Sequence, residues 1–150
     1  MTLGGTLHQH LPDIAGTEKY QRGGYQFNMI PVMIRPDSTL ARLTGLSLDA
    51  VPVSHHQAVD KLGRGLIASA WSEDLIIEAI EYPANTFTVG VQWHPEELAE
   101  EFGLFQGFID AARAKRMSGP RLATRQAESA ELGKALDPQP AGALGTAAIL

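Results

Sequence analysis

Three segments with strand character follow one another in quick succession between residues 66 and 93. They cover residues 66–71, 75–82 and 86–93, and Ile, Val, Phe, Tyr or Trp recurs in them. The short connection Pro83-Ala84-Asn85 favours a hairpin-like turn and therefore antiparallel neighbours. The last segment alternates apolar with small or polar residues, whereas the first two hold apolar runs that indicate burial on both faces. The sequence thus predicts a local antiparallel sheet.

The last of these strands leads into Gly90-Val91-Gln92-Trp93-His94-Pro95-Glu96, which presents an imidazole and a carboxylate two residues apart. Side chains at i and i+2 of an extended backbone project from the same face, and Pro95 biases His94 toward extended dihedral angles. Glu96 is therefore predicted to reach the ring of His94 and fix its tautomer. Such a pair forms the acid–base part of a catalytic triad and needs a nucleophile, usually Ser or Cys.

No convincing nucleophile is present in these 150 residues, because the chain has no cysteine. A serine nucleophile at a strand-to-helix turn carries Gly-x-Ser-x-Gly flanks. The serines that we considered all lack these flanks: Ser38, Ser47, Ser54, Ser69, Ser72 and Ser118.

Turn residues and apolar spacing predict short elements on both sides of this sheet. The apolar residues after residue 97 recur at spacings of three and four, which is typical of one helical stripe. From residue 118 onward the composition shifts to Ala, Gly, Pro and Gln, and a mostly disordered tail is expected. The expected elements are an irregular loop over 4–24, a strand over 26–34, a helix over 38–43 ended by Gly45, a strand over 50–53, a helix over 56–62 closed by Gly63, and a helix over 97–117.

Composition narrows the class of protein. The net charge of -5 is modest and the basic residues are scattered, so no nucleic-acid partner is expected. No apolar run approaches the roughly 20 residues that span a bilayer, so no membrane partner is expected and a cytoplasmic location is the default. The absence of cysteine excludes disulfides and thiolate metal sites within the chain. We expect no cofactor and no metal.

Four blocks in order along the chain carry a family resemblance. They are residues 4–12, 54–60, 78–81 and 90–96, and the second holds Ser54-His55-His56-Gln57. Together they resemble the gamma-glutamyl-gamma-aminobutyrate hydrolase-like family of the class I glutamine amidotransferase superfamily, over residues 1 to about 116. The resemblance implies a flavodoxin-like α/β fold and hydrolysis of a gamma-glutamyl amide, with polyamine catabolism as its setting.

The resemblance also assigns roles to individual residues. His94 would be the general base and then the general acid, and Glu96 would orient it. Ser54, His55, His56 and Gln57 would contact a small-molecule gamma-glutamyl substrate, although His55 and His56 cannot easily face one ligand together. The family's nucleophile is a cysteine in a Gly-x-Cys-x-Gly turn upstream of the first block, and Met1 starts after that point. We therefore expect the C-terminal half of a doubly wound sheet, with an antiparallel hairpin, that is inactive alone.

The sequence departs from the family pattern at two places. Pro52 and Val53 replace an Asn and a Ser before the double histidine, which removes two polar groups near the site. Asp74-Leu75 replaces an Asp-Gly turn, so a different hairpin geometry is expected there.

The resemblance and the change in composition together predict two regions. Residues 1–117 are predicted to form a partial glutamine amidotransferase-like domain, and residues 118–150 a low-complexity tail.

Two other functional hypotheses stay open at this point. His8, His10, the double histidine and the His94–Glu96 pair supply enough imidazole and carboxylate for a metal-dependent hydrolase, although their spacing matches no recognised metal site. Alternatively, the chain is a non-catalytic remnant or a half-domain that binds a partner. A sheet cut through its middle exposes a strand edge, which predicts self-association through that edge.

Overall fold

A computed structural model describes residues 2–21, 23–24, 26–98, 103–118 and 148–149 of the chain. These residues form a sheet of eight strands with three α-helices and one 3-10 turn, η1. The strands are β1 Thr6–His8, β2 Asn28–Ile34, β3 Ser47–Val53, β4 Ala58–Lys61, β5 Ile67–Ser72, β6 Ile77–Glu81, β7 Val89–Val91 and β8 Ala148–Ile149. The helical elements are α1 Leu11–Ala15, α2 Thr39–Thr44, η1 Pro95–Glu97 and α3 Gly103–Ser118.

The sheet has the strand order β1-β4-β6-β5-β2-β3. Strand β7 pairs with β6 on the same edge as β4 and continues along that edge. Every pair among β1 to β7 is antiparallel, and β7 pairs with β8 in parallel. The predicted antiparallel sheet over residues 66–93 is therefore confirmed, with β5, β6 and β7 as its strands. Strand β6 is central, because it pairs with β5 along one edge and with both β4 and β7 along the other.

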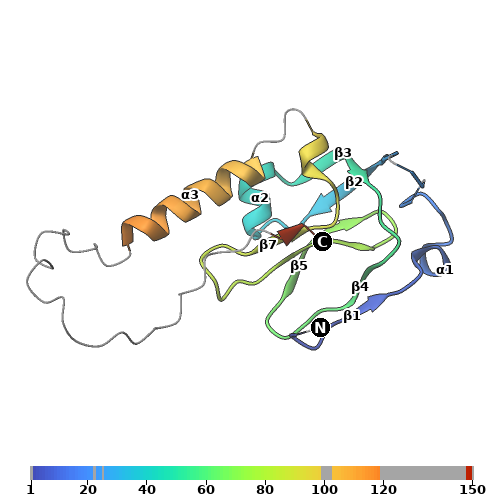
Figure 1. Cartoon of the computed structure of the whole chain (residues 1–150), viewed down its shortest axis with the longest axis horizontal. Coiled ribbons are helices and arrows are strands. Elements are labelled where there is room, and N and C mark those ends of the chain that lie inside the picture. Colours follow the sequence, from blue (N-terminus) through green and yellow to red (C-terminus); the bar gives the residue numbers. More distant parts are fainter. Residues whose placement is uncertain (1, 22, 25, 99–102, 119–147, 150) are drawn as a thin grey trace, which may run out of the picture.

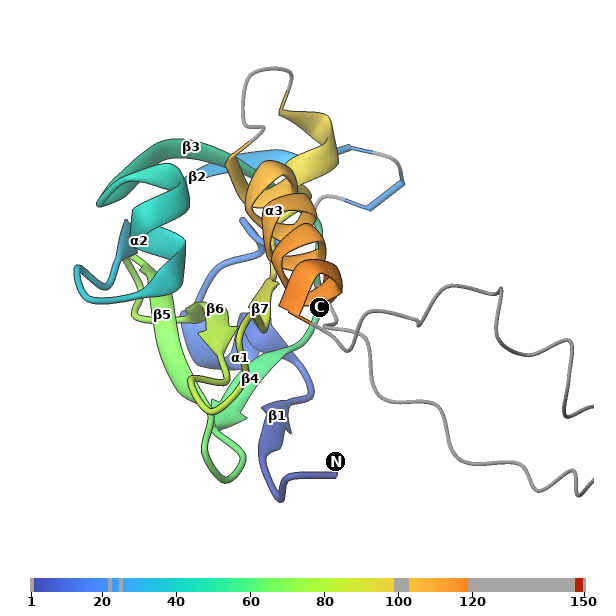
Figure 2. The same cartoon turned by 90° about the vertical axis from the view of Figure 1, so that its left-hand side faces the viewer.

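The core lies between this sheet and its helices. Burying a Val or Leu side chain stabilises a fold by about 1.5–3 kcal/mol, so the alternating apolar residues of the strands account for much of the stability. Figure 1 shows α2 and α3 next to each other, with α1 apart from them near β1 and β4, and Figure 2 shows the same pair from the side. The buried apolar side chains include Val32, Val51, Val53, Ala70, Ala79, Val91, Trp93, Leu11, Leu40 and Leu104.

Helix α2 begins where the sequence predicted it. The side chain of Ser38 accepts a hydrogen bond of 2.9 Å from the backbone N–H of Ala41. The carboxylate of Glu81, at the end of β6, accepts two more from the N–H groups of Thr39 and Leu40, at 2.9 and 2.8 Å. Backbone donors of the first turn have no partner within a helix, so these acceptors fix the start of α2.

Helix α3 packs closely against α2. A Cβ atom at Gly103 would lie 2.2 Å from the carbonyl oxygen of Leu43, and one at Gly107 would lie 2.5 Å from the Leu43 side chain. A side chain at position 103 would therefore displace the backbone of α2, whereas one at position 107 would displace only the side chain of Leu43. The predicted helix over 97–117 is confirmed in its main part, but it begins at Gly103, residues 95–97 form η1 instead, and residues 99–102 lie outside the described part.

Two sequence predictions for the N-terminal half are wrong. The predicted helix over 56–62 is strand β4, which pairs with β1 and with β6. The predicted irregular loop over 4–24 contains β1 and α1. Strands β1 and β4 pair with each other, and this pairing is not visible in the sequence. Both are also too short to show a period of two in their apolar residues.

The turn between β5 and β6 holds a leucine in an unusual backbone conformation. Leu75 has a φ of +62°, which is the left-handed conformation that the glycine of an Asp-Gly turn adopts easily. The side chain of Leu75 is exposed, so it makes little compensating contact.

The predicted boundary at residue 117 falls at the end of α3, which closes at Ser118. Most of the predicted tail, residues 119–147 and 150, lies outside the described residues. Within the described ranges, no helix has the length and apolar character required to cross a bilayer.

Candidate active site

His94 and Glu96 form a hydrogen-bonded pair directly after β7. Nδ1 of His94 lies 2.8 Å from Oε1 of Glu96. A carboxylate only accepts, so Nδ1 carries the proton, and the lone pair of the neutral ring lies on Nε2. The sequence predicted this contact from an extended backbone, but residues 95–97 form the 3-10 turn η1, and it is this turn that brings Glu96 back to the ring.

The charge of Glu96 is stabilised by its neighbours. Partial burial works against the ionised carboxylate, but the hydrogen bond from His94 and one from the backbone outweigh it and lower the pKa of Glu96. Glu96 is therefore ionised at neutral pH. An ionised partner holds the ring orientation and stabilises the imidazolium that forms when Nε2 takes a proton.

The backbone places His94 between two other segments. Its N–H donates to the carbonyl oxygen of Pro52 at 2.9 Å, which ties the end of β7 to the end of β3. The ring of Phe27 lies against the imidazole, with the two centroids 4.8 Å apart. The candidate base is thus held by the backbone on one side and by an aromatic ring on another.

The predicted substrate-side loop, residues 54–57, joins β3 to β4 beside this pair. His55 is buried, its Nδ1 lies 2.9 Å from the carbonyl oxygen of Gln57, and its backbone N–H donates to Tyr20 at 2.8 Å. Burial is the main cause that lowers the pKa of His55, and the nearby His94 lowers it further, while the bond to Gln57 opposes both. His55 is therefore a neutral imidazole at pH 7.

His56 faces away from His55, as the sequence suggested. Its Nε2 lies 2.9 Å from Nδ1 of His10, and its Nδ1 lies 2.8 Å from Oε1 of Gln21. The side chain of Gln57 donates to Gln9 at 2.7 Å. The structure therefore groups His56 and Gln57 with the segment between β1 and α1, and places only His55 against the interior.

The histidine clusters do not assemble into a metal site. His8 lies 3.8 Å from Asp60, and His10 contacts His56 rather than the His94–Glu96 pair. Across the described part of the chain, no group of three or more His, Cys, Asp or Glu side chains is arranged to hold a metal ion.

Glu78 is the site residue that the sequence analysis missed. It is fully buried in β6, and neither carboxyl oxygen has a hydrogen-bond partner. Its Oε1 lies 3.7 Å from Nε2 of His55, which is also buried without a partner. Burial raises the pKa of Glu78 to about 8, although the charge of Lys19 opposes the rise. The signal in the sequence is a carboxylate between Ile77 and Ala79, in the middle of a strand.

A sheet irregularity accompanies this side chain. Trp71 of β5 pairs with Ile77, and Ala70 pairs with Ala79, so the pairing with β5 skips Glu78. On the other edge, the backbone carbonyl of Glu78 accepts a hydrogen bond of 2.7 Å from Gln92. Bulges of this kind redirect side chains and occur often beside functional sites.

A polar network fastens the segment before β2 to the β5–β6 turn. Tyr20 bonds to Ser72 at 2.6 Å and to Asp74 at 2.8 Å, and Lys19 forms an ion pair with Asp74 at 2.7 Å. The bonds from Lys19 and Tyr20 lower the pKa of Asp74. Because the carbonyl of Tyr20 also accepts from His55, this network fixes the position of the candidate loop.

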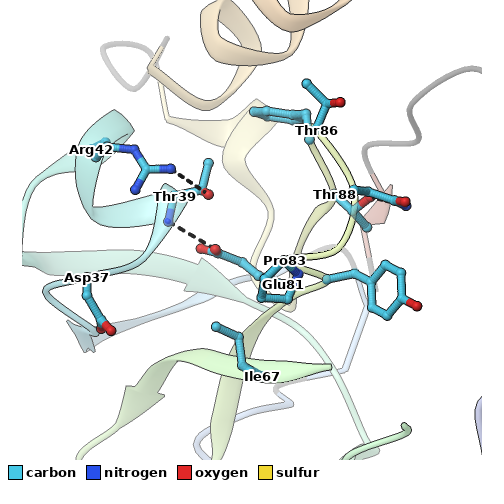
Figure 3. Close-up of a pocket in the computed structure, with 11 residues that line it drawn as sticks. Asp37, Thr39, Arg42, Ile67, Glu81, Pro83, Thr86 and Thr88 are labelled. Atoms are coloured by element: carbon cyan, nitrogen blue, oxygen red, sulfur yellow. Dashed lines mark hydrogen bonds between the residues drawn. The ribbon is translucent and has the colours of Figure 1, made fainter. Parts of the chain in front are cut away.

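The hollow shown in Figure 3 is a different place on the molecule. It has a volume of about 450 Å³ and lies between the start of α2 and the β6–β7 turn. Dashed lines in Figure 3 mark the bonds of Thr39 to Glu81 and to Arg42. None of the predicted site residues lines it, and its most buried acid, Glu81, is occupied with capping α2.

Comparison with known proteins gives these features a context. The sequence model of the peptidase C26 family matches residues 1–96. A proposed glutamine amidotransferase of Mycobacterium tuberculosis is 48% identical over 112 residues, which are 75% of this chain and 36% of that protein. The gamma-glutamyl-gamma-aminobutyrate hydrolase of Escherichia coli is 36% identical over 63 residues, or 39% of this chain and 25% of the hydrolase.

A solved structure supports the fold. A proposed GMP synthase component from Thermoplasma acidophilum superposes with a TM-score of 0.55 at 15% identity, over 76% of this chain and 51% of that one. The predicted α/β fold class is confirmed, and the chain shares this fold with the Thermoplasma protein. The chain spans about a third of the length of the Mycobacterium relative and half of the Thermoplasma chain.

Proposed function

The chain belongs to the peptidase C26 family, and on that premise we propose that it supplies the acid–base half of a glutamine amidotransferase-type hydrolase. The observation that carries the proposal is the 2.8 Å bond between His94 and Glu96, which leaves Nε2 of His94 as the proton acceptor. The loop over 54–57 lies beside this pair and would form part of the substrate site.

The reaction would use His94 twice. Nε2 would first take the proton of a cysteine thiol, and the thiolate sulfur would form a bond to the carbonyl carbon of a gamma-glutamyl amide. His94 would then give that proton to the leaving amine as the C–N bond breaks. Water, deprotonated by the same nitrogen, would hydrolyse the thioester and release glutamate and the thiol. Glu96 would stabilise the imidazolium in each half of the reaction.

We propose gamma-glutamyl-gamma-aminobutyrate as the first substrate to test. The partial similarity to the Escherichia coli hydrolase supports this choice, and the loop at residues 54–57 lies within the matched family region. The thiol that the reaction needs is not among these 150 residues, so it would come from another polypeptide segment. A cytoplasmic location would keep such a thiol reduced.

A chimeric protein would test the proposal. The segment of the Mycobacterium relative that precedes its matched region would be fused before this chain, and hydrolysis of gamma-glutamyl-gamma-aminobutyrate and of glutamine would be followed by glutamate release. We expect turnover that His94→Ala abolishes and Glu96→Gln reduces by at least tenfold, because the ring would lose its orientation. His8→Ala, at a histidine of β1 that faces Asp60, is the matched control. Turnover that survives His94→Ala would refute the role of His94.

A non-catalytic role is the second candidate, and the absence of any cysteine favours it. In that case the chain would act as a half-domain that binds a partner, or a second copy of itself, through a sheet edge. Size-exclusion chromatography with light scattering, applied to the chain alone, would show whether it binds a second copy of itself. A concentration-dependent dimer would support self-association, and a monomer at all concentrations would contradict it.

A further inference from the structure

We propose that Glu78 is a positioning residue whose protonated carboxyl group donates a hydrogen bond to Nε2 of His55 and so holds the loop over 54–57 next to His94. The inference rests on the proposed function only in treating the loop over 54–57 as part of a substrate site. The proposed bond would be present in the folded chain with or without catalysis, so it is open to direct measurement.

The hydrogen-bond partners of His55 determine where a proton is needed. Nδ1 faces the carbonyl oxygen of Gln57 at 2.9 Å, and a carbonyl only accepts, so Nδ1 carries a proton. In the neutral ring, Nε2 therefore carries a lone pair. The nearest carboxyl oxygen, Oε1 of Glu78, lies 3.7 Å from Nε2. An ionised carboxylate there would face this lone pair with no donor between them. One proton must lie between the two groups.

Burial decides which group holds that proton. Both side chains are removed from water, and a neutral acid beside a neutral imidazole avoids the cost of two buried charges. The raised pKa of Glu78 and the lowered pKa of His55 agree with this arrangement. The 3.7 Å between the two atoms exceeds the usual 2.7–3.2 Å of a hydrogen bond, so the proposal requires the Glu78 carboxyl group to turn toward Nε2 of His55.

The charges around this pair do not replace the proton. Lys19 is the cation that acts on Glu78, but its ammonium group is engaged by Asp74 at 2.7 Å. Tyr20, whose ring lies 5.2 Å from that of His55, directs its hydroxyl to Ser72 and Asp74. His94 is the remaining titratable neighbour, and its positive charge disfavours a second positive charge on His55.

This arrangement has a consequence for the proposed base. His94 must carry a positive charge during the reaction, and a neutral His55 does not oppose it. An ionised Glu78 would instead draw a proton onto His55 and place a cation next to His94. We therefore infer that Glu78 keeps the substrate-side histidine both fixed and uncharged.

Nuclear magnetic resonance of the full 150-residue chain would test the bond without any variant. Two-bond nitrogen–proton correlations report which ring nitrogens of His55 carry protons. We expect His55 as the neutral Nδ1–H tautomer from pH 5.5 to 7.5, with the Nε2 shift of a hydrogen-bonded acceptor. A doubly protonated His55 at pH 6.5 would show that Glu78 is ionised, and it would overturn the proposal.

Glu78→Gln supplies an independent test, because its amide keeps a donor at every pH. The folded pKa of Glu78, about 8, lies above its ordinary value of 4.5, so the stability from its proton is fully present below pH 4.5 and is lost as pH rises through 8. The melting temperature of Glu78→Gln minus that of the wild type should therefore rise between pH 5 and 8, by on the order of 10 °C, and then level off. A difference that stays constant with pH would contradict the proposal.

Two further variants separate positioning from packing. Glu73→Gln changes an exposed acid on the neighbouring turn and should give a flat pH difference. Glu78→Ala removes the donor, so exchange of the His55 amide, which donates to the carbonyl of Tyr20, should accelerate at least tenfold, whereas Glu78→Gln should restore the slow rate. If Glu78→Gln fails to restore it, the positioning role is wrong. These readouts need no catalysis, so they remain informative if the chimeric hydrolase proves inactive.

Discussion

Two buried glutamates on the same strand show how differently a carboxyl group can be used. Glu81 ends β6 with both oxygens bonded to backbone N–H groups of α2. Glu78, three residues earlier, has no hydrogen-bond partner for either oxygen and lies against His55. One carboxylate completes a helix, whereas the other faces a candidate site.

The difference teaches that burial alone does not define the role of an acid. A buried charge is tolerated when donors surround it, as the start of α2 surrounds Glu81. Without donors the group stays neutral, and a neutral acid is itself a donor. The number of donors facing each carboxyl group is therefore what distinguishes a structural glutamate from a functional candidate.

The largest expected effect comes from Glu81→Ala. The change leaves two N–H groups of α2 without an acceptor and opens a cavity beside the helix. We expect a loss of about 3 kcal/mol in the free energy of unfolding, measured by urea denaturation at pH 7. Glu73→Ala, at an exposed position, is the control and should change nothing measurable. A loss below about 1 kcal/mol for Glu81→Ala would remove the contrast with Glu78.

Replacing each acid with its amide should give opposite signs. Glu81→Gln keeps one acceptor oxygen and loses the charge, so we expect a loss of about 1–2 kcal/mol. Glu78→Gln imitates the protonated acid, so at pH 8 the chain should be at least as stable as the wild type. Urea denaturation of both variants in one buffer makes this comparison. A loss of similar size in both would mean that the two acids are equivalent.

Ser38→Ala should have a smaller effect, because it removes one of three acceptors at the start of α2. A loss of about 1 kcal/mol is typical of an N-cap serine. The double variant with Glu81→Gln would show whether the two caps act together, since neighbouring groups often fail to add. A strictly additive result would mean that Glu81 stabilises α2 independently of Ser38.

Leu75→Gly is the smallest change and acts on the turn that leads into β6. Relief of the left-handed conformation, worth about 1–2 kcal/mol, exceeds the entropy cost of glycine by a few tenths. We expect a gain of about 0.5 kcal/mol in the free energy of unfolding with no change in the pH dependence that Glu78 imposes. A changed pH dependence would show that the turn, and not the carboxyl group, is responsible for it.

The sequence predicted features that depend on neighbours along the chain. Ser38 caps α2 as expected, since the capping bond joins residues only three apart. The contact between His94 and Glu96 is present for a similar reason, although a 3-10 turn rather than a strand produces it. Local geometry can be read from such short separations.

Features that join distant segments could not be predicted in this way. The strand at residues 58–61 has too few residues to show a period, and its identity comes from pairing with β1 and β6. In the sequence Glu78 was only one of two acids in a strand, because its neighbour His55 lies in another part of the chain. Which of two nearby glutamates faces donors is decided by tertiary packing.

Pro52 shows how a site can tolerate change without losing its geometry. Its contribution to His94 is a backbone carbonyl oxygen, which every amino acid provides. Strand β3 lies at the end of the strand order, where the missing N–H of a proline is tolerated. The side chain at position 52 can therefore change while the carbonyl oxygen that holds His94 stays in place, so the main chain alone fixes the location of the base.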